Sequence, residues 1–84
     1  EPNFLLRKKI EAECHRRFPH LWVPLYSMVT FSPHISYQEA LRVGDIQKEI
    51  MDEIMAREDI FQCWQHDEIY QQIEQRAIAR IGGK

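Results

Sequence analysis

The sequence predicts a mainly α-helical fold: a small segment of about three helices in antiparallel packing, with one extended stretch near residues 22–31. On both sides of that stretch, apolar residues recur every three or four positions, which is the spacing of one helix face. Pro24 and Pro33 bracket the stretch and favour extended backbone in the residues before them. With 84 residues, the chain is expected to be a single domain, residues 1–84.

The first expected helix runs from Phe4 to Arg17, with Asn3 as its N-cap. Pro19 ends it, because a proline inside a helix removes a hydrogen bond and clashes with the preceding turn. Its expected buried face repeats at intervals of four residues and consists of Leu6, Ile10, Cys14 and Phe18.

The second expected helix begins at a capping box, Ser36-x-x-Glu39, in which each side chain bonds the other residue's backbone amide. We expect it to end near Arg57, with Gly44 marking a bend or a tight contact. Its apolar stripe is Ala40, Val43, Ile46 or Gln47, Ile50, Ile54 and Met55.

The third helical region has two candidate N-caps, Asp59 and Asp67. Gly82 and Gly83 provide its C-terminal stop. One face of this helix is formed by Ile69, Ile73, Ala77 and Ile81. The short connections between the helices favour antiparallel neighbours.

Composition argues against several classes of protein. A net charge of -2 and a pI near 6.1 do not favour binding to nucleic acid or to an anionic membrane. No stretch approaches the ~20 apolar residues that a membrane span requires. Two cysteines make no disulfide framework, so we expect a cytoplasmic protein. Because the chain starts at Glu1 and enters a helical pattern at once, we expect it to be part of a longer protein whose remainder lies upstream.

The sequence offers few residues for catalysis or metal binding. Cys63 and His66 share a helix face and form half of a zinc site, but the other candidates, Cys14, His15, His20 and His34, are scattered. Surface histidines and core cysteines are therefore favoured over a metal site. The neighbouring acids Asp52 and Glu53 point about 100° apart on a helix and are expected to be solvated. We expect no catalytic and no metal-binding residue in this chain.

Several stretches resemble the C-terminal part of kynurenine 3-monooxygenase. The most distinctive is the extended core Pro-Leu-Tyr-Ser-Met-Val-Thr-Phe-Ser, residues 24–32. The others are Asn-Phe-Leu-Leu-Arg-Lys-Lys-Ile at 3–10, Arg-Phe-Pro at 17–19 and Ser-Tyr-x-x-Ala-Leu at 36–41. The resemblance covers most of residues 3–55 and is expected to fade after about residue 56.

The resemblance implies an FAD-dependent aromatic hydroxylase that uses NADPH and O2 to convert L-kynurenine to 3-hydroxy-L-kynurenine, in tryptophan degradation and NAD biosynthesis. The flavin does the difficult chemistry, and the protein positions the substrate and excludes water. The FAD-binding domain belongs upstream in the same polypeptide and is this chain's implied partner. No FAD-binding residue can then be assigned here, and the fragment alone is not expected to be active.

The resemblance also assigns site residues. Tyr26 matches a tyrosine near the substrate pocket, and Met28 and Phe31 match its neighbours. We expect Tyr26 and Met28 to bind substrate and Phe31 to support the pocket wall. Members with a membrane anchor carry a hydrophobic helix after this region, whereas residues 60–81 are charged and amphipathic. Whether this tail covers the active site as a lid stays open.

Two alternatives remain. The chain could belong to another aromatic-ring flavin hydroxylase with a different substrate. It could instead be a non-enzymatic helical interaction module that grips a partner helix through two apolar stripes, Ile46-Ile50-Ile54 and Ile69-Ile73-Ala77.

Overall fold

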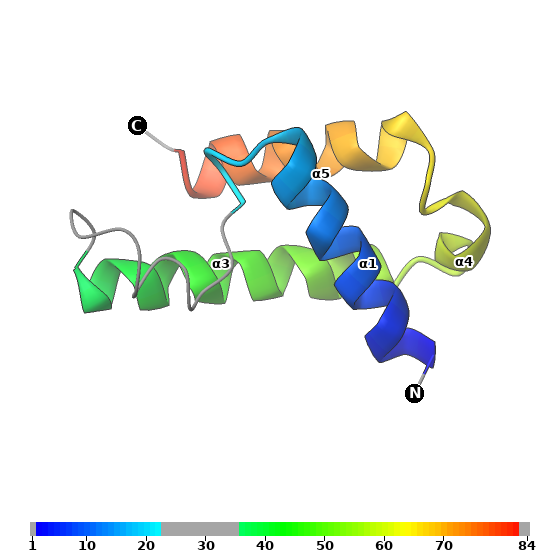
Figure 1. Ribbon diagram of the computed structural model, residues 1–84, viewed down its shortest axis with the longest axis horizontal. Helices are drawn as coiled ribbons and strands as arrows, with labels where there is room; N and C mark the ends of the chain where they lie inside the picture. The colour runs from blue at the N-terminus through cyan, green and yellow to red at the C-terminus, as the bar shows by residue number, and fades with distance from the viewer. Residues whose placement is uncertain (1, 23–35, 83–84) are drawn as a thin grey trace.

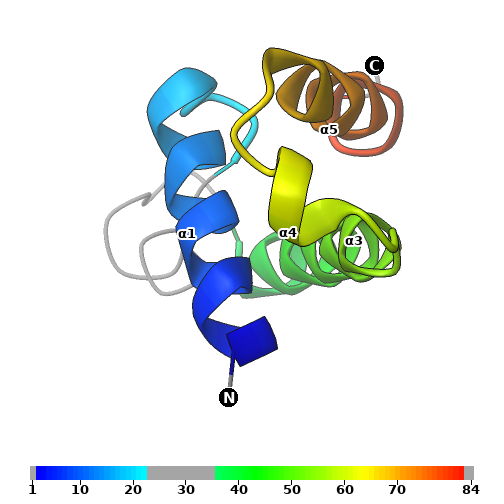
Figure 2. The same cartoon turned by 90° about the vertical axis from the view of Figure 1, so that its right-hand side faces the viewer.

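The structure is a computed structural model that describes residues 2–22 and 36–82 (Figure 1). The described residues form four helices and no strand, which confirms the mainly α fold class. The helices are α1 (Pro2–Arg17), α3 (Tyr37–Met55), α4 (Ile60–Cys63) and α5 (Asp67–Arg80). Helices α3 and α5 run antiparallel beside each other, and α1 crosses the pair (Figures 1 and 2). Except for Trp22, the predicted extended stretch lies outside the described residues.

Helix α1 presents the predicted face to the core. The four predicted apolar residues are all buried, which confirms the interval of four: Leu6, Ile10 and Cys14 in the helix and Phe18 directly after it. The predicted N-cap at Asn3 is wrong, because the helix begins at Pro2. Proline is well suited to a first helical position, where its missing N–H would have no helical partner. At the other end, the Trp22 amide donates to the Phe18 carbonyl oxygen at 3.0 Å and turns the chain before the gap.

Helix α3 begins where the sequence predicts. The Ser36 hydroxyl accepts a hydrogen bond from the Glu39 amide at 3.0 Å. The Glu39 carboxylate, expected to return a bond to Ser36, instead pairs with Arg42 at 2.6 Å. The helix ends at Met55, two residues before the predicted end at Arg57. Its buried face takes Gln47 rather than Ile46 and adds Met51.

The third predicted helix is two helices. Asp59 precedes α4, and His66, not Asp67, precedes α5; neither preceding residue caps through its side chain. Asp67 and Glu68 lie in the first turn of α5, where negative charge stabilises a helix start. Between the two helices the His66 amide donates to the Cys63 carbonyl oxygen at 2.9 Å. The break allows both helices to direct apolar residues into the same core.

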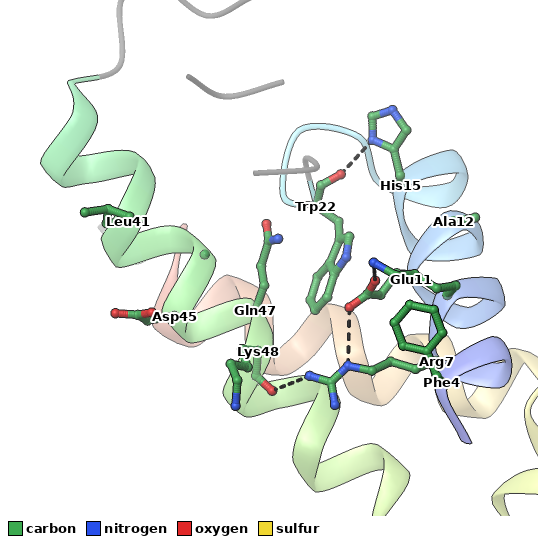
Figure 3. Close-up of a pocket in the computed structure, with 12 residues that line it drawn as sticks. Phe4, Arg7, Glu11, Ala12, His15, Trp22, Leu41, Asp45, Gln47 and Lys48 are labelled. Carbon is green, nitrogen blue, oxygen red and sulfur yellow. Dashed lines mark hydrogen bonds and ion pairs between the residues drawn. The ribbon is translucent and has the colours of Figure 1, made fainter. Parts of the chain in front are cut away.

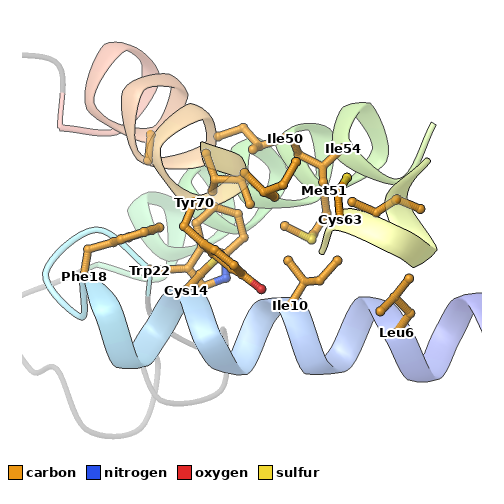
Figure 4. Packing of buried hydrophobic residues seen from close by; sticks show 14 residues of the cluster. Leu6, Ile10, Cys14, Phe18, Trp22, Ile50, Met51, Ile54, Cys63 and Tyr70 are labelled. Carbon is orange, nitrogen blue, oxygen red and sulfur yellow. The ribbon is translucent and has the colours of Figure 1, made fainter. Parts of the chain in front are cut away.

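One apolar core joins all four described helices (Figure 4). Its fully buried members include Ile10 from α1, Ile50 from α3 and Ile73 from α5. The stripes that the interaction-module alternative assigned to a partner helix are largely internal: Ile50, Ile54, Ile69, Ile73 and Ala77 are all buried. This corrects that alternative, because only half-buried Ile46 remains partly available to a partner.

The neighbouring acids of α3 reach two different helices. Asp52 forms an ion pair with Arg7 of α1 at 2.8 Å. Glu53 pairs with Arg76 and Arg80 of α5, at 3.0 and 2.9 Å. The roughly 100° between successive residues on a helix explains the divergence. The structure confirms that these two carboxylates are exposed and do not act on one common atom.

None of the helices in the described residues is both long enough and apolar enough to cross a membrane.

We predict that Ile73→Ala lowers the free energy of unfolding by about 2 to 5 kcal/mol, because a fully buried side chain is replaced by a cavity. Urea denaturation followed by circular dichroism measures the change. The matched control is Ile78→Ala on the same helix, where the side chain is exposed and the change should stay within about 0.5 kcal/mol. Equal losses for the two variants would contradict the described packing.

Candidate functional site

The three residues assigned by resemblance lie outside the part of the chain that the structure describes. Tyr26, Met28 and Phe31 all fall within residues 23–35. The assignment of Tyr26 and Met28 to substrate, and of Phe31 to the pocket wall, therefore stays a prediction. The structure does describe the two residues that flank this segment, Trp22 and Ser36.

Both flanking residues are held in place. Trp22 is only 3% exposed, and its ring packs edge-on against Phe18 with the centroids 6.4 Å apart. The Trp22 carbonyl oxygen lies 2.7 Å from Nδ1 of His15, at hydrogen-bonding distance (Figure 3). At the other end, the cap hydrogen bond fixes Ser36 to the first turn of α3. The segment that carries Tyr26 therefore starts and ends at ordered points.

Beside Trp22, α1 and the N-terminal half of α3 enclose a groove of about 920 Å³ (Figure 3). The sequence did not predict it. Residues from both helices and the turn line it: Phe4, Arg7, Lys8, Glu11, Ala12, His15, Trp22, Leu41, Gly44, Asp45, Gln47 and Lys48. Apolar and charged side chains are mixed along it, which suits recognition of a surface or ligand better than catalysis.

The charged rim of the groove is tied together within the chain. Arg7 donates to Asp52 Oδ1 at 2.8 Å and to the Lys48 carbonyl oxygen at 3.3 Å, and its Nε lies 3.6 Å from Glu11. Lys48 Nζ lies 3.3 Å from Asp52 Oδ2. The Arg7 guanidinium holds the pKa of the Asp52 carboxyl below its usual range. These contacts link α1 to α3 along the groove.

A second polar cluster lies where α1 meets α5. Glu13 accepts hydrogen bonds from Arg16 Nε at 3.0 Å and from Arg17 Nε at 2.7 Å. These two arginines lower the pKa of Glu13 to about 2. Arg17 also pairs with Asp67 at 3.1 Å, and its guanidinium lies 4.3 Å from the centre of the Tyr70 ring, within reach of a cation–π interaction. The cluster links the last turn of α1 to the first turn of α5.

The candidate nucleophiles in the described residues are suppressed by burial. Burial raises the pKa of the Cys14 and Cys63 thiols, so both are protonated at neutral pH. It also raises the pKa of Tyr70, whose buried hydroxyl has no hydrogen-bond partner among the residues that the structure describes. Among residues 2–22 and 36–82, no three His, Cys, Asp or Glu side chains gather in a way that could hold a metal ion. The accessible feature described above is the groove between α1 and α3.

The chain is similar to one part of several curated proteins. It is 49% identical over 73 residues to a kynurenine 3-monooxygenase from Christiangramia forsetii and 47% identical over 73 residues to one from Flavobacterium psychrophilum. A kynurenine 3-monooxygenase from Caenorhabditis elegans is 43% identical over 53 residues. The first two matches cover 87% of this chain and 16% of each relative, and the third covers 63% and 11%. No family model matches the chain, and no solved structure matches it significantly.

These matches confirm the resemblance predicted from the sequence, for a segment of the relatives rather than their full length. A match over 73 of the 84 residues includes residues 12–73 wherever it starts, so it reaches well into α5. The expected fading after about residue 56 is therefore wrong for the first two relatives. Shared sequence in α5 agrees with its share of the common core.

We predict that Glu13→Gln weakens the fold at neutral pH and flattens its acid dependence. Because the folded-state pKa of Glu13 lies near 2, below its ordinary 4.5, its ionised form stabilises the fold above about pH 4.5. That stabilisation disappears as the pH falls from 4.5 towards 2, so the wild type and the variant should converge there. Urea denaturation across this range measures the difference. Glu49→Gln, which removes an exposed carboxylate from α3, is the control. If both variants showed the same dependence of stability on pH, the ion pairs of Glu13 would not be the cause of the acid dependence.

Proposed function

We propose that this chain is the C-terminal part of a kynurenine 3-monooxygenase and works as its substrate-pocket segment. The observation that carries the proposal is the 49% identity to a protein of that name across 87% of the chain. Since the chain spans 16% of that relative's length, the activity belongs to a larger protein of which this is one part. Its reaction would be hydroxylation of L-kynurenine to 3-hydroxy-L-kynurenine with NADPH and O2.

FAD would bind outside this chain. Phosphate groups of such cofactors are held by glycine-rich turns that open a helix. Of the glycines that the structure describes, Gly44 lies inside α3 and Gly82 follows α5, so these residues do not fit a dinucleotide site. When bound in the remaining domain, FAD supplies the oxygen-transfer chemistry. This chain's residues contribute substrate contact and water exclusion.

Tyr26 is the residue that we assign to substrate, with Met28 beside it and Phe31 supporting the pocket wall. The support is indirect. The segment that carries them is held at Trp22 by core packing and at Ser36 by a helix cap. The proposed site thus lies in sequence between two residues whose positions the structure describes.

The direct test measures NADPH oxidation by the full-length protein with and without L-kynurenine, together with chromatographic detection of 3-hydroxykynurenine. We expect kynurenine to stimulate oxidation and the hydroxylated product to accumulate. If the protein bound flavin but its rate of NADPH oxidation did not change with kynurenine, the result would favour a hydroxylase of another aromatic substrate. A protein without flavin or product would refute the proposal.

We predict that Tyr26→Phe in the full-length protein lowers kcat/KM for kynurenine about two- to thirtyfold, because the loss of one hydrogen bond costs about 0.5 to 2 kcal/mol. The ring is kept, so flavin content and thermal stability should not change. Tyr37→Phe is the matched control, since its ring is exposed at the start of α3. Unchanged steady-state constants for Tyr26→Phe would remove this hydroxyl from the site.

A further inference from the structure

Large apolar side chains remain exposed on the described helices, and two of them belong to one feature. The exposed residues are Phe4, Leu5, Tyr37, Leu41, Phe61 and Ile78. Phe4 from α1 and Leu41 from α3 both line the groove, with exposed fractions of 53% and 39% (Figure 3). Trp22 lies between the two helices and completes an apolar surface. No groove residue comes from α4 or α5.

Arg7 and Lys48, two of the charged residues that line this groove, already have ion-pair partners within the chain. A charge that loses water on docking is costly unless it already has a partner. Arg7 is paired with Asp52 and Glu11, and Lys48 is paired with Asp52. A partner that covers the groove therefore need not supply counter-charges for these groups. The groove suits an apolar partner surface.

The comparisons indicate where such a partner comes from. The chain corresponds to 16% of the length of its first two relatives, so most of each relative lies outside the match. Parts of one polypeptide that pack as separate units commonly bury about 600 to 1,500 Å² between them. An apolar groove on the smaller part is a natural place for that contact.

We propose that the groove between α1 and α3 is the surface through which this helical unit docks on the larger remainder of the same protein, which inserts apolar side chains between Phe4 and Leu41. The inference rests on the proposed function for the existence of that remainder. It goes further by choosing one face of the unit and leaving the exposed faces of α4 and α5 in solvent.

The flanks of the segment that carries Tyr26 agree with this choice. Trp22, four residues before Tyr26, lines the groove, and Ser36 lies five residues before Leu41 on the opposite wall. A docked partner in the groove would therefore lie beside both ends of the segment assigned to substrate. The same contact would join the two parts of the protein next to the proposed pocket.

Photo-crosslinking in the full-length protein tests the proposal. Benzoylphenylalanine is placed at Phe4 or Leu41 in the groove, and at Phe61 or Ile78 as matched controls. The pairs are matched in exposure, 53% against 50% and 39% against 47%. After irradiation, mass spectrometry identifies the cross-linked peptides. We expect Phe4 and Leu41 to reach peptides outside these 84 residues in several-fold higher yield than Phe61 and Ile78.

Every other pattern overturns the docking surface. Cross-links from Phe4 and Leu41 only to residues of this chain would mean that the groove is filled internally, and cross-links between two copies would make it an oligomer contact. Higher yields at Phe61 or Ile78, or no cross-links at Phe4 and Leu41, would place the interface elsewhere. The kynurenine assay is independent of these maps. If the protein made no product but cross-linked as expected, the proposed activity would be refuted and the proposed docking surface would be supported.

Discussion

The burial of α5 against α1 and α3 is the contact on which the rest of the structure depends. Helices α4 and α5 supply six of the fourteen residues in the main core cluster. A domain of this size has little apolar area to spare, so losing that share would leave α1 and α3 without a sufficient core. The sequence left open whether residues 58–81 form a lid. Since α5 is built into the core, a hinge motion of this helix alone would expose Ile69, Ile73 and Ala77 to water.

The same packing explains what kind of site the chain can offer. Its two thiols and the Tyr70 hydroxyl are enclosed, so reactive groups are withdrawn from solvent. The features that remain accessible are a groove with an internally paired rim and the fixed flanks at Trp22 and Ser36. Under the proposed function, such a unit would position substrate beside a cofactor that another part of the protein holds.

Local signals in the sequence predicted most of the fold. The interval of four residues identified the buried residues Leu6, Ile10 and Cys14 of α1 and Phe18 directly after it, and Ser36 marked the start of α3. The prediction failed where two local signals compete. Asp59 and Asp67 both offered a helix start, and the chain uses a start near each of them. The Glu39 carboxylate, which the predicted capping box assigned to the Ser36 amide, pairs instead with Arg42 one turn away.

The groove was missed for a different reason. Phe4, Lys8 and Ala12 repeat at intervals of four along α1, as the residues of the core face do. Because Lys8 is charged, this second row does not read as an apolar face in the sequence. The opposite wall of the groove, including Leu41, is distant in sequence, and the two helices meet through long-range contacts such as Arg7 with Asp52, which the sequence pattern does not show. The assignment of Tyr26, Met28 and Phe31 rests on resemblance and stays a prediction, because these residues lie outside the part of the chain that the structure describes.

The adjacent acids of α3 have a consequence for how such proteins diverge. One residue inserted or deleted in the middle of α3 would turn everything after it by about 100°. Asp52 would swing away from Arg7 and Glu53 from Arg76 and Arg80, while Ile54 would leave the core. A substitution in α3 removes the contacts of one residue, whereas a change of length displaces the contacts of all the residues after it. A change in the length of this helix would therefore disturb more contacts than most single substitutions in it.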